Sequence, residues 1–298
     1  MKNTTPSRAD LLAWGILLIL ALVWGSSYIL IKKSLVAFSN TQVAYLRIGI
    51  TGAAFFPFLI YHFRRIDWSS WPYLLLVGLT GTAIPAFLFA TAQQDISSSL
   101  AGILSSLTPL LTVVVATVVY SQRIDRQRVI GIATGLVGAV VLFASQGLTW
   151  DAELLACGMI VLACLCYATS SNTVGAKLKH MNAMTISAAS FSMVGIPAAI
   201  ILFTTNFQSV LVEHPHGWQS FYAVVFLALM GTVLMSLLFF YLVQMRDAVF
   251  ASVVSYLIPI VAIGWGVWDG EQVTLWQFGG MALILGGVYL SRKRRSLR

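Results

Sequence analysis

Charged residues are scarce in this sequence. Lysine, arginine, aspartate and glutamate make up 9% of the 298 residues, whereas an ordinary soluble domain carries about 25%. Apolar residues make up 58%, and the mean hydropathy is +0.86. So few charges cannot cover the surface of a water-soluble globule of this length. The composition therefore excludes a soluble enzyme, a disordered chain and a disulfide scaffold, and it indicates a multi-pass membrane protein.

Cysteine is nearly absent, and acids and histidines are missing from the middle of the apolar segments. The three cysteines, Cys157, Cys164 and Cys166, share one apolar segment, where small packing residues are the simplest interpretation. All ten acids and all four histidines fall in loops or at segment ends. We therefore predict no metal site, no cofactor and no catalytic residue.

The apolar segments are long enough to cross a bilayer, which takes about 20 mostly apolar residues per helix. We predict an all-α integral membrane protein with ten transmembrane helices. Their expected ranges are 11–31, 43–63, 71–92, 97–119, 128–146, 153–176, 183–205, 220–243, 248–268 and 274–291.

Basic residues are distributed unevenly between the loops. With the N-terminus in the cytoplasm, 15 of the 18 lysines and arginines fall in inside segments, two fall outside, and Arg47 lies within the second span. Cytoplasmic loops of membrane proteins carry such an excess. We therefore predict a multi-pass protein of the cell inner membrane with both termini in the cytoplasm. The basic tail fits the same rule, so we expect no nucleic-acid partner.

The two halves of the chain resemble each other at an offset of 150 residues. This offset pairs Gly81-Thr82 with Gly231-Thr232, Gln94 with Gln244, and Pro109 with Pro259. Each half holds five predicted spans, an odd number, so the second half starts on the opposite side of the membrane. The pattern predicts two inverted-topology five-helix repeats, residues 1–149 and 150–298, an arrangement that recurs in secondary transporters.

Several short motifs occur in a fixed order along these spans. They are Trp24-Gly25-Ser26-Ser27, Tyr45-Leu46-Arg47, the stretch from Ser99-Leu100-Ala101 to Leu107-Thr108-Pro109, and Leu257-Ile258-Pro259 with Gly270-Glu271. This order resembles the drug/metabolite transporter superfamily, EamA type, over nearly the whole chain. The resemblance implies a ten-helix transporter whose spans 1, 3, 4, 6, 8 and 9 line a central cavity. One position departs from the pattern: Ser121 stands where the family usually has an acid that matches Glu271.

Aromatic and hydroxyl side chains in these spans form our candidate site, because apolar rings with a few hydroxyls suit a small amphipathic molecule. For any single aromatic residue, packing or lipid contact is the simpler alternative. The candidate substrate-binding residues are Trp24, Ser27, Tyr28, Phe87, Thr91, Ser105, Tyr167, Ser171, Tyr241, Ser255 and Tyr256. Phe89 and Phe239 lie in the same spans.

Three further residues stand out inside the spans. Pro109 and Pro259 each remove a helical hydrogen bond at matched positions, and they are either hinges of the central site or purely structural kinks. Arg47 is the one charge well inside a span. It is either a structural clamp, which we favour, or a counter-ion for a substrate carboxylate or phosphate.

Together these features predict an inner-membrane secondary transporter. It would move small amphipathic metabolites, such as amino acids or related compounds, by alternating access. Export follows from the family resemblance alone. Proton-coupled multidrug or cation efflux is the alternative. A proton-coupled pump and a carrier of bare cations both need a buried titratable group, and the absence of such a group from the middle of the spans disfavours this alternative. A non-transporting sensor or enzyme is a second alternative. The expected partners are a small-molecule substrate and membrane lipid, with the protein a monomer or weak homodimer.

Overall fold

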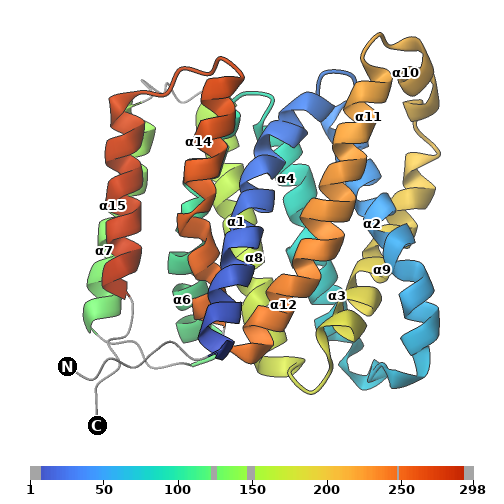
Figure 1. Cartoon of the computed structure of the whole chain (residues 1–298), viewed down its shortest axis with the longest axis horizontal. Coiled ribbons are helices and arrows are strands. Elements are labelled where there is room, and N and C mark those ends of the chain that lie inside the picture. Colours follow the sequence, from blue (N-terminus) through green and yellow to red (C-terminus); the bar gives the residue numbers. More distant parts are fainter. Residues whose placement is uncertain (1–7, 122–125, 146–151, 247, 292–298) are drawn as a thin grey trace.

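The computed structural model describes residues 8–121, 126–145, 152–246 and 248–291, and within these ranges all regular elements are helical (Figure 1). The helices are α1 (Arg8–Ser34), α2 (Asn40–His62), α3 (Trp71–Gly78), α4 (Ile84–Ala92), α5 (Ser98–Leu104), α6 (Thr108–Val118), α7 (Arg126–Ser145), α8 (Ala152–Lys177), α9 (Ala183–Leu202), α10 (Phe207–Glu213), α11 (Gly217–Phe226), α12 (Met235–Met245), α13 (Ala248–Ala251), α14 (Ile258–Trp268) and α15 (Leu275–Ser291). The predicted boundary between the two repeats, at residues 149 and 150, lies outside the described residues.

Long apolar helices make this a multi-pass membrane protein. Seven stretches of the described chain are long and apolar enough to cross a bilayer: Leu11–Ser34, Asn40–Arg65, Trp68–Ala92, Ser98–Val118, Ala152–Lys177, Ala183–Leu202 and Gly217–Met245. Two shorter apolar stretches, Val254–Trp268 and Leu275–Gly287, follow. Helical elements lie at all ten predicted segments, while the count of ten crossings stays a prediction.

Within the described residues, four of the predicted spans are interrupted rather than continuous α-helices. The π-helical segments η3 (Leu79–Ala83) and η5 (Leu227–Leu234) join α3 to α4 and α11 to α12. The 3₁₀ segments η4 (Ser105–Leu107) and η6 (Ser252–Tyr256) stand before α6 and α14. Remaining short 3₁₀ turns are η1 (Phe63–Arg65) and η2 (Trp68–Ser70). Such irregular turns often mark functional sites.

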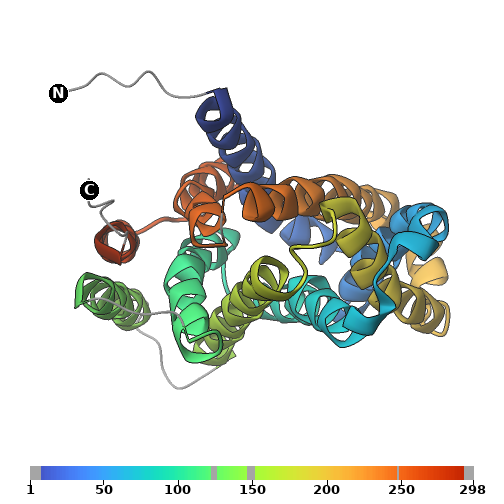
Figure 2. The same ribbon diagram turned by 90° about the horizontal axis from the view of Figure 1, so that it is seen from below.

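Glycines allow the closest helix contacts. A Cβ atom on Gly52 of α2 would overlap the backbone of Gly195 on α9, and the reverse is also true. Likewise, a Cβ atom on Gly287 of α15 would overlap the backbone of Gly131 and Gly135 on α7. Since small residues let membrane helices approach each other closely, these glycines fix two helix pairs. The α7–α15 pair forms one end of the molecule (Figures 1 and 2).

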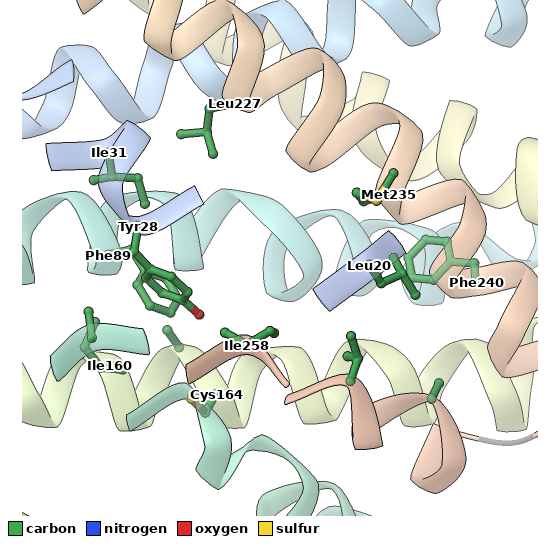
Figure 3. Packing of buried hydrophobic residues seen from close by; sticks show 14 of the residues in the cluster. Leu20, Tyr28, Ile31, Phe89, Ile160, Cys164, Leu227, Met235, Phe240 and Ile258 are labelled. Carbon is green, nitrogen blue, oxygen red and sulfur yellow. The ribbon is translucent and has the colours of Figure 1, made fainter. Parts of the chain in front are cut away.

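The centre of the molecule contains α1, α8, α12 and α14, with α4 and α6 beside them (Figure 1). Buried apolar side chains from these helices form the main core, and Tyr28 of α1 and Phe89 of α4 lie against each other there (Figure 3). The three cysteines are buried with free thiols, as packing residues would be.

Candidate functional site

A cavity of about 100 Å³ lies in the centre of the molecule. Its walls come from α1, α2, α4, α8 and α12, from the π segments η3 and η5, from the helix breaks at η4 and η6, and from the first residues of α6 and α14. The wall therefore draws on residues from both halves of the sequence.

Aromatic rings form much of the wall. The ring centroids of Trp24 and Phe239 are 5.2 Å apart, and those of Tyr28 and Phe89 are 5.6 Å apart. Phe89 also stacks on Tyr167 at 6.1 Å. Aromatic pairs at these distances stabilise the packing beyond the burial of their area. The cavity thus has aromatic walls on the α1, α4 and α8 sides.

Hydroxyl groups are the most numerous polar groups on the wall. The lining hydroxyl side chains are Ser27, Ser105, Thr108, Ser170, Ser171, Thr232, Ser236 and Ser255, with the phenols of Tyr28 and Tyr167. Several of the hydroxyls bond to backbone carbonyls of their own helix, as Ser27 does to Val23 at 3.1 Å. The wall offers a polar molecule neutral donors and acceptors.

Arg47 is the one charged residue among the described residues that line the cavity. It is 7% exposed, and its Nε atom donates a hydrogen bond to Thr232 Oγ1 at 3.1 Å. No carboxylate of the described ranges lies within 4.0 Å of its guanidinium. The bond to Thr232 joins α2 to η5, while the charge of Arg47 has no acidic partner among the described residues. Both predicted roles of Arg47, structural clamp and counter-ion, therefore stay predictions.

The two π segments correspond to each other at the 150-residue offset. Gly81 in η3 and Gly231 in η5 both reach the cavity wall. The Trp24 indole Nε1 donates to the Gly231 carbonyl at 2.8 Å. Because a π turn disturbs the regular i→i−4 ladder, its carbonyls become available to partners on other helices. The repeated Gly-Thr pairs of the sequence thus mark two irregular turns at the cavity.

The two predicted hinge prolines also occupy corresponding places. Pro109 and Pro259 stand in the first turn of α6 and α14, directly after the 3₁₀ breaks. Pro109 cannot donate to the carbonyl of Ser105. That carbonyl accepts instead from the Thr108 backbone N–H and, at 2.7 Å, from the Thr108 hydroxyl. In the second half the corresponding residue is Ile258, which has no hydroxyl.

The eleven predicted substrate-binding residues divide into two groups. Seven lie together on the cavity wall: Trp24, Ser27, Tyr28, Ser105, Tyr167, Ser171 and Ser255. The other four do not appear in that wall: Phe87 packs edge-on against Tyr45 at 5.0 Å, Thr91 accepts a hydrogen bond from Asn40 Nδ2 at 3.0 Å, Tyr241 is 46% exposed, and Tyr256 is half-buried against the core. Substrate binding by any of them stays a prediction.

Sequence reasoning missed several residues that line the cavity. They include Thr108, Ser170, Thr232, Ser236 and Phe240. A signal existed for Thr232, because it belongs to the repeated Gly-Thr pair. Ser236 follows it by four residues, about one helical turn, and could have been found from that spacing.

Beside the cavity, charged and hydroxyl groups join the ends of three helices. This Glu271 cluster consists of Lys32, Lys33, Ser98, Ser99, Asp269 and Glu271. Lys32 lies 2.8 Å from both Asp269 and Glu271, and Lys33 also pairs with Asp269. The cluster ties the end of α1 to the end of α14, one residue beyond the cavity-lining Ile31.

Glu271 also caps α5. Its carboxylate accepts hydrogen bonds from the backbone N–H groups of Ser98 and Ser99, at 3.1 and 3.0 Å, and from both serine hydroxyls, at 2.8 and 2.6 Å. Burial alone would raise the pKa of Glu271. The hydrogen bonds from Lys32, Ser99 and Ser98 outweigh this effect and lower the pKa to about 2. Glu271 is therefore ionised at physiological pH.

Gly270 explains why glycine stands before this glutamate. Its φ angle is +85°, a left-handed conformation that glycine adopts without steric penalty. The N–H of Glu271 bonds to the Gly266 carbonyl at 2.8 Å and that of Gly270 to Val267 at 3.1 Å, which is the Schellman ending of a helix. This reversal turns Glu271 back toward α5.

Two stretches of the chain, residues 12–144 and 154–292, match the model of the EamA-like transporter family. The chain is 24% identical to an "Uncharacterized transporter" of Archaeoglobus fulgidus, over 95% of this chain and 99% of that protein. It is 24% identical to the "Uncharacterized inner membrane transporter YedA" of Escherichia coli strain K12, over 93% and 89%. It is 25% identical to a "Probable amino-acid metabolite efflux pump" of Salmonella typhimurium, over 94% and 96%. These names describe transporters rather than enzymes.

A solved structure described as "Crystal structure of protein" has the same fold. The TM-score is 0.62 at 19% identity, and the alignment covers 96% of each chain. At this identity the likeness concerns the fold alone.

Proposed function

The chain belongs to the EamA-like transporter family, and from this membership we propose that it is a secondary transporter of the inner membrane. Its substrates are small amphipathic metabolites, such as amino acids or related compounds, and it exports them by alternating access. The name of the Salmonella typhimurium relative, which describes amino-acid metabolite efflux, supports the substrate class and the direction.

The observation that carries this proposal is the central cavity. Aromatic rings such as Trp24 and Tyr28 stand beside the hydroxyls of Ser27 and Ser171. A site with apolar walls and a few polar groups binds molecules that have both an apolar and a polar part. Residues from both halves of the chain contribute, as alternating access around one central site requires.

The size of the cavity supports a conformational cycle. Its volume of about 100 Å³ is smaller than the roughly 150 Å³ cavity that holds benzene in an engineered protein core. A metabolite larger than benzene therefore needs the walls to separate. The 3₁₀ breaks before Pro109 and Pro259 are our proposed hinges, and the Glu271 cluster closes the cavity at the end of α1.

The topology we propose has ten crossings in two inverted repeats, residues 1–149 and 150–298, with both termini in the cytoplasm. Under this topology the Glu271 cluster faces the outside. The protein works in lipid as a monomer or weak homodimer.

Proton-coupled cation efflux fits the site less well. The charge on the cavity wall is positive, because it comes from Arg47, and it repels cations. Glu271, with a pKa of about 2, holds no proton to exchange at neutral pH. The described lining residues contain no acid and no histidine.

Transport by purified protein in liposomes tests the proposal. We expect uptake of at least one compound from a panel of amino acids, organic acids, nucleosides and amphipathic amines. Tyr28→Ala, which opens the aromatic wall, should reduce that uptake, whereas Trp268→Ala, at a ring that is 77% exposed, should not. If the wild-type protein moves no compound of the panel, the proposed function is wrong.

A further inference from the structure

We propose that Arg47 binds the carboxylate group of the substrate, so that the transporter selects amphipathic molecules with a carboxylate over amines and neutral compounds. This inference rests on the proposed function, because it takes the central cavity as the substrate site. It goes further by assigning the charge of the substrate and the residue that recognises it.

The first argument is the incomplete pairing of the guanidinium. Arg47 is 7% exposed and belongs to the cavity wall. A guanidinium has five N–H donors, and the Nε–H is used by Thr232. Four donors remain on the two terminal nitrogens. Tyr167 lies beside them and offers one neutral oxygen, which leaves the positive charge uncompensated.

The second argument is the position of the acids. Within the described part of the chain, the carboxylates in ion pairs are Asp67, Asp269 and Glu271, and their partners are His180, Lys32 and Lys33. These carboxylates are thus paired with groups other than Arg47. A buried charge is costly unless it is paired. The protein therefore keeps a cation at its cavity whose natural partner is an anion that enters with the substrate.

The third argument concerns geometry. The planar fork of arginine matches the two oxygens of a carboxylate and forms paired, charge-assisted hydrogen bonds with it. A single positive charge balances a single negative charge, so one carboxylate suits the site better than a doubly charged phosphate. Next to Arg47, the rings of Tyr28 and Tyr167 provide the surface for the apolar part of the substrate.

A matched ligand series tests the inference on the full-length protein in detergent. The ligands are 3-phenylpropionate, phenylalanine, 3-phenylpropanamide and phenethylamine, which share a ring and differ in charge. Their dissociation constants are measured by isothermal titration calorimetry at pH 7. We expect the wild-type protein to bind the two carboxylates at least tenfold more tightly than the amide and the amine.

Variants then assign the preference to Arg47. Arg47→Gln should weaken binding of 3-phenylpropionate about ten- to a hundredfold, the loss expected for one charge-assisted hydrogen bond. Binding of the amide should stay within threefold, which also shows that the variant is folded. Arg47→Lys keeps the positive charge but not the planar fork, so its affinity for 3-phenylpropionate should lie between that of the wild type and that of Arg47→Gln. Arg65→Gln, at an exposed residue, is the control and should bind as the wild type does.

Two results would overturn the inference. One is wild-type protein that binds the amine or the amide as tightly as the carboxylates, a comparison that holds even if Arg47→Gln does not fold. The other is a folded Arg47→Gln variant with unchanged carboxylate binding. In either case, transport of another compound in liposomes would leave the proposed function intact, whereas absence of any transport would refute that function itself.

Discussion

At Pro109 the backbone has to replace a hydrogen bond that proline cannot make. The Ser105 carbonyl receives no N–H from Pro109, and it accepts instead from both the backbone N–H and the hydroxyl of Thr108. A tight 3₁₀ turn with a nearby hydroxyl thus lets a helix break inside a membrane without leaving a carbonyl unpaired. At the residue scale, the cavity wall therefore contains hydroxyls that bond to the backbone at a helix break as well as hydroxyls that face the cavity.

Glu271 makes stability depend on pH in acid. Its folded-state pKa of about 2 lies below the ordinary value of 4.5. A depressed carboxyl pKa stabilises the fold above the ordinary value, and this contribution is lost as the pH falls from about 4.5 toward 2. The thermal midpoint should fall over this window in the wild type, and the fall should be smaller in Glu271→Gln. Glu213→Gln, at an exposed acid, should follow the wild type; a curve for Glu271→Gln identical to the wild type would refute the assignment.

At the scale of helices, the irregular turns decide which side chains reach the cavity. The apolar segments of the sequence were sufficient to predict where each helix lies. Trp24 and Tyr28 were selected because the family resemblance implied which spans line a cavity and because aromatic side chains suit its wall. It was not sufficient for Phe87 and Tyr241, which follow the π segments η3 and η5. One residue occupies about 100° of an α-helix, so a wider turn moves the following residues to another face. Phe89 and Phe239 occupy the wall instead.

Contacts between residues far apart in the sequence could not be predicted either. Nothing in the spacing of residues links Arg47 to Thr232 or Glu271 to Ser98, because these pairs form only when distant helices meet. The Gly270-Glu271 pair was visible as a motif, but its role as a cap on α5 emerged only from the geometry.

Helix pairing through glycine can be tested at α2 and α9. Gly52→Ala places a methyl group against the backbone of Gly195, where neither side can yield easily. Overpacking of this kind costs about 1–3 kcal/mol or more, so the yield of folded protein and its thermal midpoint should fall. Gly158→Ala adds the same methyl group to α8 with nothing within 4 Å. If both variants are equally stable, the close contact does not determine the pairing.

At the scale of the whole molecule, the basic residues predict the orientation. Reporter fusions after residue 150 and after residue 298 should report the periplasm and the cytoplasm, respectively. A periplasmic signal at the C-terminus would refute the count of ten crossings and the inverted repeat together.

Energy coupling is a second property of the whole molecule. Because the described cavity wall holds no acid or histidine, transport in liposomes should persist when a protonophore collapses the pH difference. An imposed inward or outward substrate gradient should set the direction. Transport that stops with the protonophore would require a proton pathway through groups at the helix ends.

The contacts that complete the cavity join residues far apart in the chain, and this has a consequence for synthesis. Trp24 bonds to Gly231, which is synthesised 207 residues later, and Arg47 bonds to Thr232, 185 residues later. Lys32 bonds to Glu271, 239 residues later. The first helix therefore enters the membrane long before its partners leave the ribosome. In a nascent chain that ends before α14, Lys32 and Lys33 have no Asp269 or Glu271 to pair with. These polar contacts of the first helix therefore form only when the last third of the chain has been synthesised.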